Sequence, residues 1–127
     1  MLIIRGEQFE ALSAGRWRQF KARVAAHVTE VLPARAAALG TNGLTAAIDR
    51  HVAAGQGWGL ASERDLARYV DLLVGLGPEI GADVPGSWIG PMMADQSLPP
   101  GERLAVIYAM LPERAPECAG LAAWWVS

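Results

Sequence analysis

The sequence is poor in the residues that crosslink chains or bind metals. Cys118 is the only cysteine in 127 residues, so it can form no internal disulfide and no pair of thiolate ligands. The two histidines, His27 and His51, have no second ligand at a helical metal-binding spacing. We therefore expect no cofactor and no zinc. A single cysteine also favours a reducing compartment, and the cytoplasm is the predicted location.

Long apolar runs and an export signal are missing as well. The N-terminus becomes charged at Arg5 after a short apolar stretch, which lacks the basic start and apolar core of a signal peptide. No uninterrupted apolar run approaches the roughly 18 to 20 residues needed to cross a bilayer. We expect neither export nor a transmembrane role.

The composition is that of a globular protein, with 52% hydrophobic and 19% charged residues. A chain of this length fits one domain, predicted to span residues 1–127. The formal net charge is −2, but residues 1–70 hold nine basic and six acidic side chains, and residues 71–127 hold two and seven. This asymmetry predicts an electrically polar molecule and favours a stable complex with another protein. Ten of the eleven basic residues are arginine, which suits interfaces, although a GC-rich genome produces the same bias.

Apolar residues recur every three or four positions in the first half of the chain, which predicts helices. A leader from Phe9 is expected to break at Gly15, and a main helix to run from about Arg16 to Leu32, before Pro33. Residues 34–39 are predicted to form one or two helical turns that end at glycine 40. A further helix is predicted to be capped at residue 41 or 42, to carry apolar residues at positions 44, 48 and 52, and to end at the glycines at 55, 57 and 59.

The next helix is predicted to start at Ser62, whose hydroxyl can accept from the amide of Asp65 while that carboxylate reaches back. Its wide apolar face indicates a central position. Residues 77–101 hold five prolines and five glycines, so only a turn near residues 88–94 is expected there. Ser97 is predicted to cap the last main helix. The fold class is therefore all-α, an irregular bundle of about five helices with a Gly/Pro-rich loop before the last main helix.

Catalytic motifs are not found. There is no Gly-x-Ser-x-Gly elbow, and Cys118 is interpreted as a packed thiol. The glycines from Gly55 follow a helix and lack the Gly-Lys-Ser/Thr ending of a phosphate loop. Glu63, Asp65 and Asp71 on one helix could supply paired carboxylates, but with Asp65 expected at a cap and arginines nearby they are interpreted as an ordinary charged helix face. The sequence predicts no catalytic residue.

Arginines and tryptophans are over-represented in binding hot spots, so they supply the candidate partner-binding residues. Residues 16–23 suit a partner with an acidic surface, or form a solvated basic face over a buried Trp17. The aromatics there have inward spacing and the chain is acidic, which argues against nucleic acid. Two adjacent tryptophans point in different directions, so one can enter the core while the other meets a partner, or both can pack within the molecule. The full candidate set is Arg16, Trp17, Lys21, Trp58, Arg64, Arg68, Trp88, Trp124 and Trp125.

Three features together resemble a known group of proteins: the helix at residues 20–28, the stretch Gly59-Leu-Ala-Ser-Glu-Arg-Asp-Leu-Ala-Arg-Tyr-Val-Asp-Leu, and a following Gly-Pro loop with a tryptophan. The likeness covers residues 9–111 and is sharpest at 58–78. It is to small helical bacterial proteins whose genes accompany type VI secretion spike and effector genes. The resemblance implies a cytoplasmic accessory protein, not an enzyme, that binds an effector or spike component as an adaptor or chaperone would. The loop at residues 77–88 is richer in glycine than is usual in that group.

Two hypotheses from other functional classes remain open at this stage. An immunity protein would bind and occlude a cognate toxin, forming a tight one-to-one complex. A small enzyme or toxin would use a cryptic site around His51, Trp58 and Glu63. The sequence leaves the partner's identity, the stoichiometry and the oligomeric state undetermined.

Overall fold

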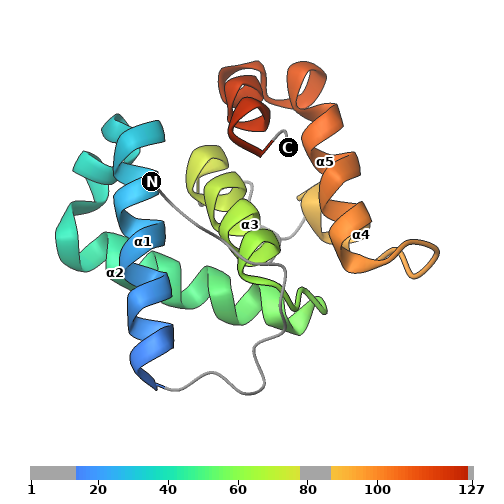
Figure 1. Cartoon of the computed structure of the whole chain (residues 1–127). Helices are drawn as coiled ribbons and strands as arrows, with labels where there is room; N and C mark the ends of the chain where they lie inside the picture. Colours follow the sequence, from blue (N-terminus) through green and yellow to red (C-terminus); the bar gives the residue numbers. More distant parts are fainter. Residues whose placement is uncertain (1–13, 78–86, 126–127) are drawn as a thin grey trace.

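A computed structural model describes residues 14–77 and 87–125 (Figure 1). These two ranges are built of helices and contain no strand, which confirms the predicted all-α class. None of the described helices is both long and apolar enough to cross a membrane. The elements in chain order are α1 (Ala14–Val31), α2 (Pro33–Gly57), α3 (Glu63–Leu76), α4 (Ile89–Met93), α5 (Pro100–Arg114) and the 3₁₀ helix η1 (Pro116–Trp125).

Helix α3 lies at the centre of the molecule, as its wide apolar face predicts. Figure 1 shows it between α1 and α2 on one side and α4, α5 and η1 on the other. Eleven of its fourteen residues are buried, among them Leu66, Tyr69 and Val70, which have no exposed surface. The core around this helix draws on every element, so the position of α3 sets where the charged groups of its own sequence end up.

Helices α1 and α2 are separated by one residue, and α2 is bent at Gly40. Helix α2 starts with Pro33 at its first position, where a missing amide hydrogen costs nothing. Gly40 interrupts it with φ 72° and ψ 171°, a backbone region that suits glycine, so the predicted break is confirmed. The predicted main helix is confirmed as α1, which begins at Ala14, close to the expected start at Arg16, and includes Gly15 as its second residue. The predicted leader at residues 9–13 lies outside the described residues.

The predicted start of α3 is confirmed, because the Ser62 hydroxyl accepts from the amide of Asp65 at 3.0 Å. The Asp65 carboxylate accepts instead from Arg68, at 3.1 Å. The predicted cap at Ser97 is wrong: Ser97 donates to Asp95 through both its amide and its hydroxyl, and α5 begins three residues later. The Ser97 hydroxyl, which a helix cap would use as an acceptor, is instead engaged as a donor in a turn closed by the Asp95 carboxylate.

Helix α4 confirms the turn expected near residues 88–94, and most of the Gly/Pro-rich loop before it, residues 78–86, lies outside the described residues. Arg103 holds α4, the start of α5 and the end of α2 together. Its buried guanidinium donates to the carbonyls of Leu98 at 2.8 Å and Met93 at 3.0 Å, and more weakly to that of Trp58 at 3.4 Å. One buried guanidinium thereby provides donors to three backbone carbonyls that lie at or beyond the ends of helices.

Candidate protein-binding site

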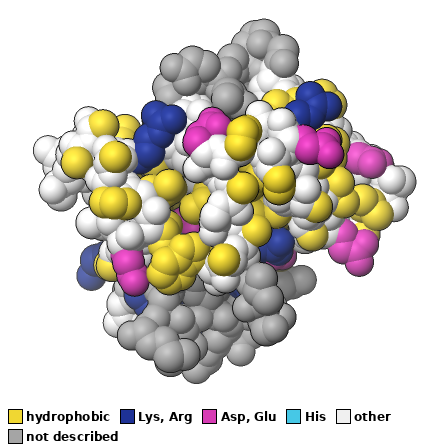
Figure 2. All heavy atoms as spheres, turned by 90° about the horizontal axis from the view of Figure 1, so that it is seen from above, with side chains coloured by type: hydrophobic (Ala, Val, Ile, Leu, Met, Phe, Trp, Pro, Cys, Tyr) yellow, Lys and Arg dark blue, Asp and Glu magenta, His cyan; other side chains and the backbone are white. Residues whose placement is uncertain are grey.

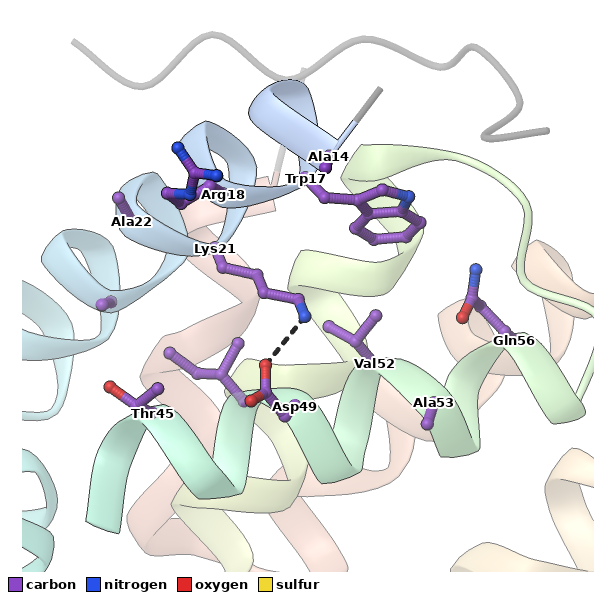
Figure 3. Close-up of a pocket in the computed structure, with 12 residues that line it drawn as sticks. Ala14, Trp17, Arg18, Lys21, Ala22, Thr45, Asp49, Val52, Ala53 and Gln56 are labelled. Carbon is purple, nitrogen blue, oxygen red and sulfur yellow. Dashed lines mark ion pairs between the residues drawn. The ribbon is translucent and has the colours of Figure 1, made fainter. Parts of the chain in front are cut away.

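An open groove of about 730 Å³ runs between α1 and α2 (Figure 3). Ile48 and Val52, which are buried, contribute to its lining from α2. The groove is hollow because many of the remaining side chains that line it are small. The complete lining consists of Ala14, Trp17, Arg18, Lys21, Ala22, Ala25, Thr45, Ile48, Asp49, Val52, Ala53 and Gln56.

An ion pair crosses this groove. Lys21 on α1 and Asp49 on α2 approach to 2.8 Å, with 38% and 52% of their side chains exposed (Figure 3). The Lys21 ammonium also lies 5.8 Å from the ring centre of Trp17. An exposed pair of this kind contributes only about 0 to 1 kcal/mol to stability. A carboxylate on another protein can therefore replace Asp49 at little cost.

Trp17 forms one end of the groove on a rigid support. Its ring meets the fully buried ring of Phe20 edge to face, with centres 6.0 Å apart and planes at 73°. The side chain is only partly buried, so its indole is both anchored in the core and accessible. Pre-ordered aromatic surface of this kind lowers the entropy lost on binding.

The other basic residues of α1 differ in whether they form ion pairs within the molecule. Arg16 and Arg23 face Glu63 at 3.7 Å and 3.0 Å, and the Glu63 side chain is only 3% exposed. The interpretation of Glu63 as part of an ordinary charged helix face is therefore wrong, because packing of α1 on α3 encloses its carboxylate. Arg18 makes no ion pair with any residue in 14–77 or 87–125, and it lies at the rim of the groove.

A second polar cluster joins α1, α3 and η1. His27 Nε2 and Asp71 Oδ2 lie 2.6 Å apart, and the Trp125 indole N–H donates to the same oxygen at 3.1 Å. His27 is 6% exposed and Asp71 is fully buried. Burial raises the pKa of Asp71 above its usual value, and the His27 and Trp125 hydrogen bonds and the charge of His27 oppose that rise. The ordinary charged helix face predicted for Asp71 is also wrong, because packing of α1 and η1 on α3 encloses its carboxylate.

The arginines of α3 are largely occupied within the molecule. Arg64 donates to the Trp125 carbonyl and lies 5.9 Å from its ring centre. Arg68 pairs with Asp65 at 3.1 Å and lies 5.3 Å from the ring of Tyr108. The Tyr108 hydroxyl in turn donates to the Arg68 carbonyl at 2.5 Å. Burial above all, and then the nearby Asp71 charge, raise the pKa of Tyr108 well above its usual value.

The four other tryptophans in the candidate set occupy different surroundings. Trp124 is 49% exposed and meets the His27 ring edge to face, whereas Trp125 is partly buried. Trp88 is partly buried with the Arg114 guanidinium 5.7 Å from its ring centre. Trp58 packs against the core and lines a smaller pocket of about 310 Å³. The nine candidates are thus distributed over several faces and do not form one patch.

The cryptic enzyme site suggested by the sequence has only partial geometric support. His51 and Trp58 do line the smaller pocket, together with Arg50 and Tyr69. Glu63 does not line it and faces the arginines of α1 instead. Within residues 14–77 and 87–125, no three His, Cys, Asp or Glu side chains gather as metal ligands would.

Sequence reasoning missed the association of His27 with Asp71. The two residues are 44 positions apart, so no local spacing relates them. A signal was present in the immediate context of Asp71, which interrupts the apolar run from Val70 to Val74. A carboxylate flanked by core residues needs a partner from another element, and His27 is the partner that packing supplies.

Comparison of this chain with protein-family models, with curated proteins and with solved structures finds no match. The resemblance to proteins encoded beside secretion genes therefore stays a prediction from the sequence.

Proposed function

We propose that this protein is a non-catalytic accessory that binds another protein through the groove between α1 and α2. The observation that carries the proposal is the groove itself, an apolar hollow of about 730 Å³ with a half-buried Trp17 at its end. Pockets that accept an aromatic or aliphatic anchor beside a polar rim are typical of binding hot spots. Arg18 and Lys21 at the rim favour a partner that presents carboxylates.

The predicted partner is a type VI secretion effector or spike component, which this protein would escort in the cytoplasm as an adaptor or chaperone. This part of the proposal rests on the sequence resemblance and on the lone cysteine. The groove supports protein binding in general and does not distinguish among partners. Figure 2 shows apolar side chains between charges of both signs on the face seen from above, with no continuous basic surface among the described residues there. Such a face favours a protein partner over nucleic acid.

A matched pair of variants tests the groove. Ala22 lines it, whereas Ala26, one helical turn later on α1, is exposed and does not. Ala22→Arg fills the groove with a long charged side chain, and Ala26→Arg adds the same group outside it. Both substitutions replace an exposed alanine in a helix, so circular dichroism is expected to show an intact fold in each.

The experiment is co-purification of the tagged protein from its native host, with mass spectrometry, followed by reconstitution from purified components. We expect a secretion effector or spike protein to bind the wild type and Ala26→Arg, and binding to Ala22→Arg to fall at least about tenfold, a loss of about 1.4 kcal/mol. Equal binding by all three proteins would show that the groove is not the interface. Recovery of only the free monomer at low salt would contradict the proposal as a whole.

The same complex separates an adaptor from an immunity protein. If the captured partner is an enzyme, its activity is measured with and without this protein. An adaptor leaves that activity in place, whereas an immunity protein abolishes it at a one-to-one ratio. Loss of activity would replace the adaptor role and keep the binding role.

A further inference from the structure

The last described segment, η1, is held in place by few of its own residues. It is a ten-residue 3₁₀ helix, Pro116–Trp125, in which only Cys118 and Leu121 are buried. Runs of 3₁₀ helix longer than about four residues are uncommon, because their hydrogen-bond geometry is poorer than that of an α-helix. The segment therefore depends on side-chain contacts with the rest of the molecule, chiefly with α3 and α5.

Two contacts fix it on α3. The first is a notch at Gly75, where a β-carbon would lie 3.1 Å from Leu121 and 3.3 Å from the sulfur of Cys118. The second is Trp125, which donates to Asp71 and accepts from Arg64. The segment is thus held by apolar packing of Cys118 and Leu121 at Gly75 and by hydrogen bonds of Trp125 at its end, of which we call the one to Asp71 the latch.

Closing this latch carries its own energetic cost. In the described structure, Asp71 Oδ1 is buried and has no hydrogen-bond partner. An unsatisfied buried acceptor is unfavourable, because it has lost its hydrogen bonds to water and gained none in return. Withdrawal of Trp125 from beside Asp71 would let water reach this carboxylate. The contacts that hold η1 against α3 are therefore partly offset by the loss of hydration at the Asp71 carboxylate.

We propose that Pro116–Trp125 is a strap that opens as a unit while the helical bundle stays folded, and that the Trp125–Asp71 hydrogen bond is its latch. Opening removes the cover from a face of α1 and α3 that contains His27, Asp71 and Gly75. The bundle keeps its core when the strap leaves, because buried side chains of α1, α2 and α5 each pack on α3 without it. This inference is independent of the groove between α1 and α2.

Cys118 reports on the strap directly, since it is the only cysteine and lies within it. It is 3% exposed, and burial and the Glu117 charge raise the pKa of its thiol, so it reacts slowly while the strap is closed. The test measures the labelling rate of the intact protein by a thiol reagent over a series of urea concentrations below the unfolding transition. Global unfolding is followed in parallel by circular dichroism.

A strap gives labelling at least about tenfold faster than the global unfolding equilibrium allows, with a shallower dependence on urea because less surface is exposed. Trp125→Phe keeps a ring and removes the latch donor, so we expect labelling to accelerate by about fivefold to thirtyfold. Trp124→Phe is the matched control. Its indole N–H has no hydrogen-bond partner among the described residues, and its labelling is expected to stay within about twofold of the wild type.

Two results would overturn the inference. Labelling that follows global unfolding in both rate and urea dependence would show that η1 opens only when the bundle does. Equal acceleration by Trp124→Phe and Trp125→Phe would show that the Asp71 hydrogen bond is not the latch.

Discussion

His27 and Asp71 form a buried pair at 2.6 Å between α1 and α3. We expect His27→Ala to lower the free energy of unfolding by about 3 to 5 kcal/mol, because it leaves a buried carboxylate without its main partner. Lys21→Ala provides the comparison, since it breaks the exposed pair with Asp49 on the same helix and is expected to cost about 0 to 1 kcal/mol. Urea unfolding of both variants measures the difference. A similar decrease in the free energy of unfolding for both variants would show that the buried His27–Asp71 pair is no more important to stability than the exposed pair.

Gly55 lies where α2 packs on α3. A β-carbon there would sit 2.8 Å from Leu66, 3.2 Å from Tyr69 and 3.3 Å from Leu60. Gly55→Ala is therefore expected to destabilise the fold by about 1 to 3 kcal/mol through overpacking. At Gly57 in the same helix a β-carbon would meet nothing within 4 Å, so Gly57→Ala is expected to be neutral or to stabilise by up to about 1 kcal/mol. Thermal unfolding of the two variants checks this order, and the opposite order would contradict the packing described.

Tyr108 makes stability sensitive to alkaline pH. Its pKa is raised well above the usual 10.0, so the native state keeps a proton that the unfolded state loses first. The Tyr108 contribution is complete below pH 10.0 and is lost as pH rises towards the native pKa, with a slope of up to about 1.4 kcal/mol per pH unit.

Tyr108→Phe should remove this slope. At neutral pH the variant is expected to lose about 0.5 to 1.5 kcal/mol, because the hydroxyl no longer donates to the Arg68 carbonyl. The stability gap between wild type and variant should then narrow as the solution becomes alkaline. Urea unfolding across that pH range measures the gap, and ultraviolet absorbance follows phenol ionisation. A gap that stays constant would show that Tyr108 titrates normally.

Arg103 fixes irregular backbone through the geometry of its guanidinium. Lysine cannot reproduce donation to the carbonyls of Leu98 and Met93 from two different nitrogens. Arg103→Lys is expected to cost about 1.5 to 3 kcal/mol, the range for hydrogen bonds that involve a charged group. Arg35→Lys, at an exposed position of α2, is the control and should change stability by less than about 0.5 kcal/mol. Chemical unfolding compares the two, and a tolerated Arg103→Lys would show that charge alone suffices.

Local patterns predicted most of the helices because the causes are local. The Ser62 cap requires one hydroxyl and one amide three residues apart, and the break at Gly40 requires only a backbone that glycine adopts easily. Where two local options compete, the pattern fails. Ser97 was such a case, since it had both a helix and an Asx turn within reach and took the turn.

The candidate site was predicted only in part. Trp17 and Lys21 were selected by residue type, and both line the groove. The groove itself depends on the small side chains of two helices that face each other, which neither helix reveals alone. Arg64 and Trp125 were also selected, but their contact spans 61 residues and places them within the molecule. Whether either residue meets a partner stays a prediction.

The sequence by itself determined an all-α fold with α3 at its centre, because apolar periodicity, glycine breaks and one serine cap act over a few residues. The tertiary structure decided which charges are buried. Asp71 and Glu63 look alike in sequence, as carboxylates on one helix with arginines nearby, yet each is enclosed with a different partner from α1. Those partners lie 40 and 44 residues away. Burial and charge pairing arise from how helices pack, and residue spacing within one helix does not contain that information.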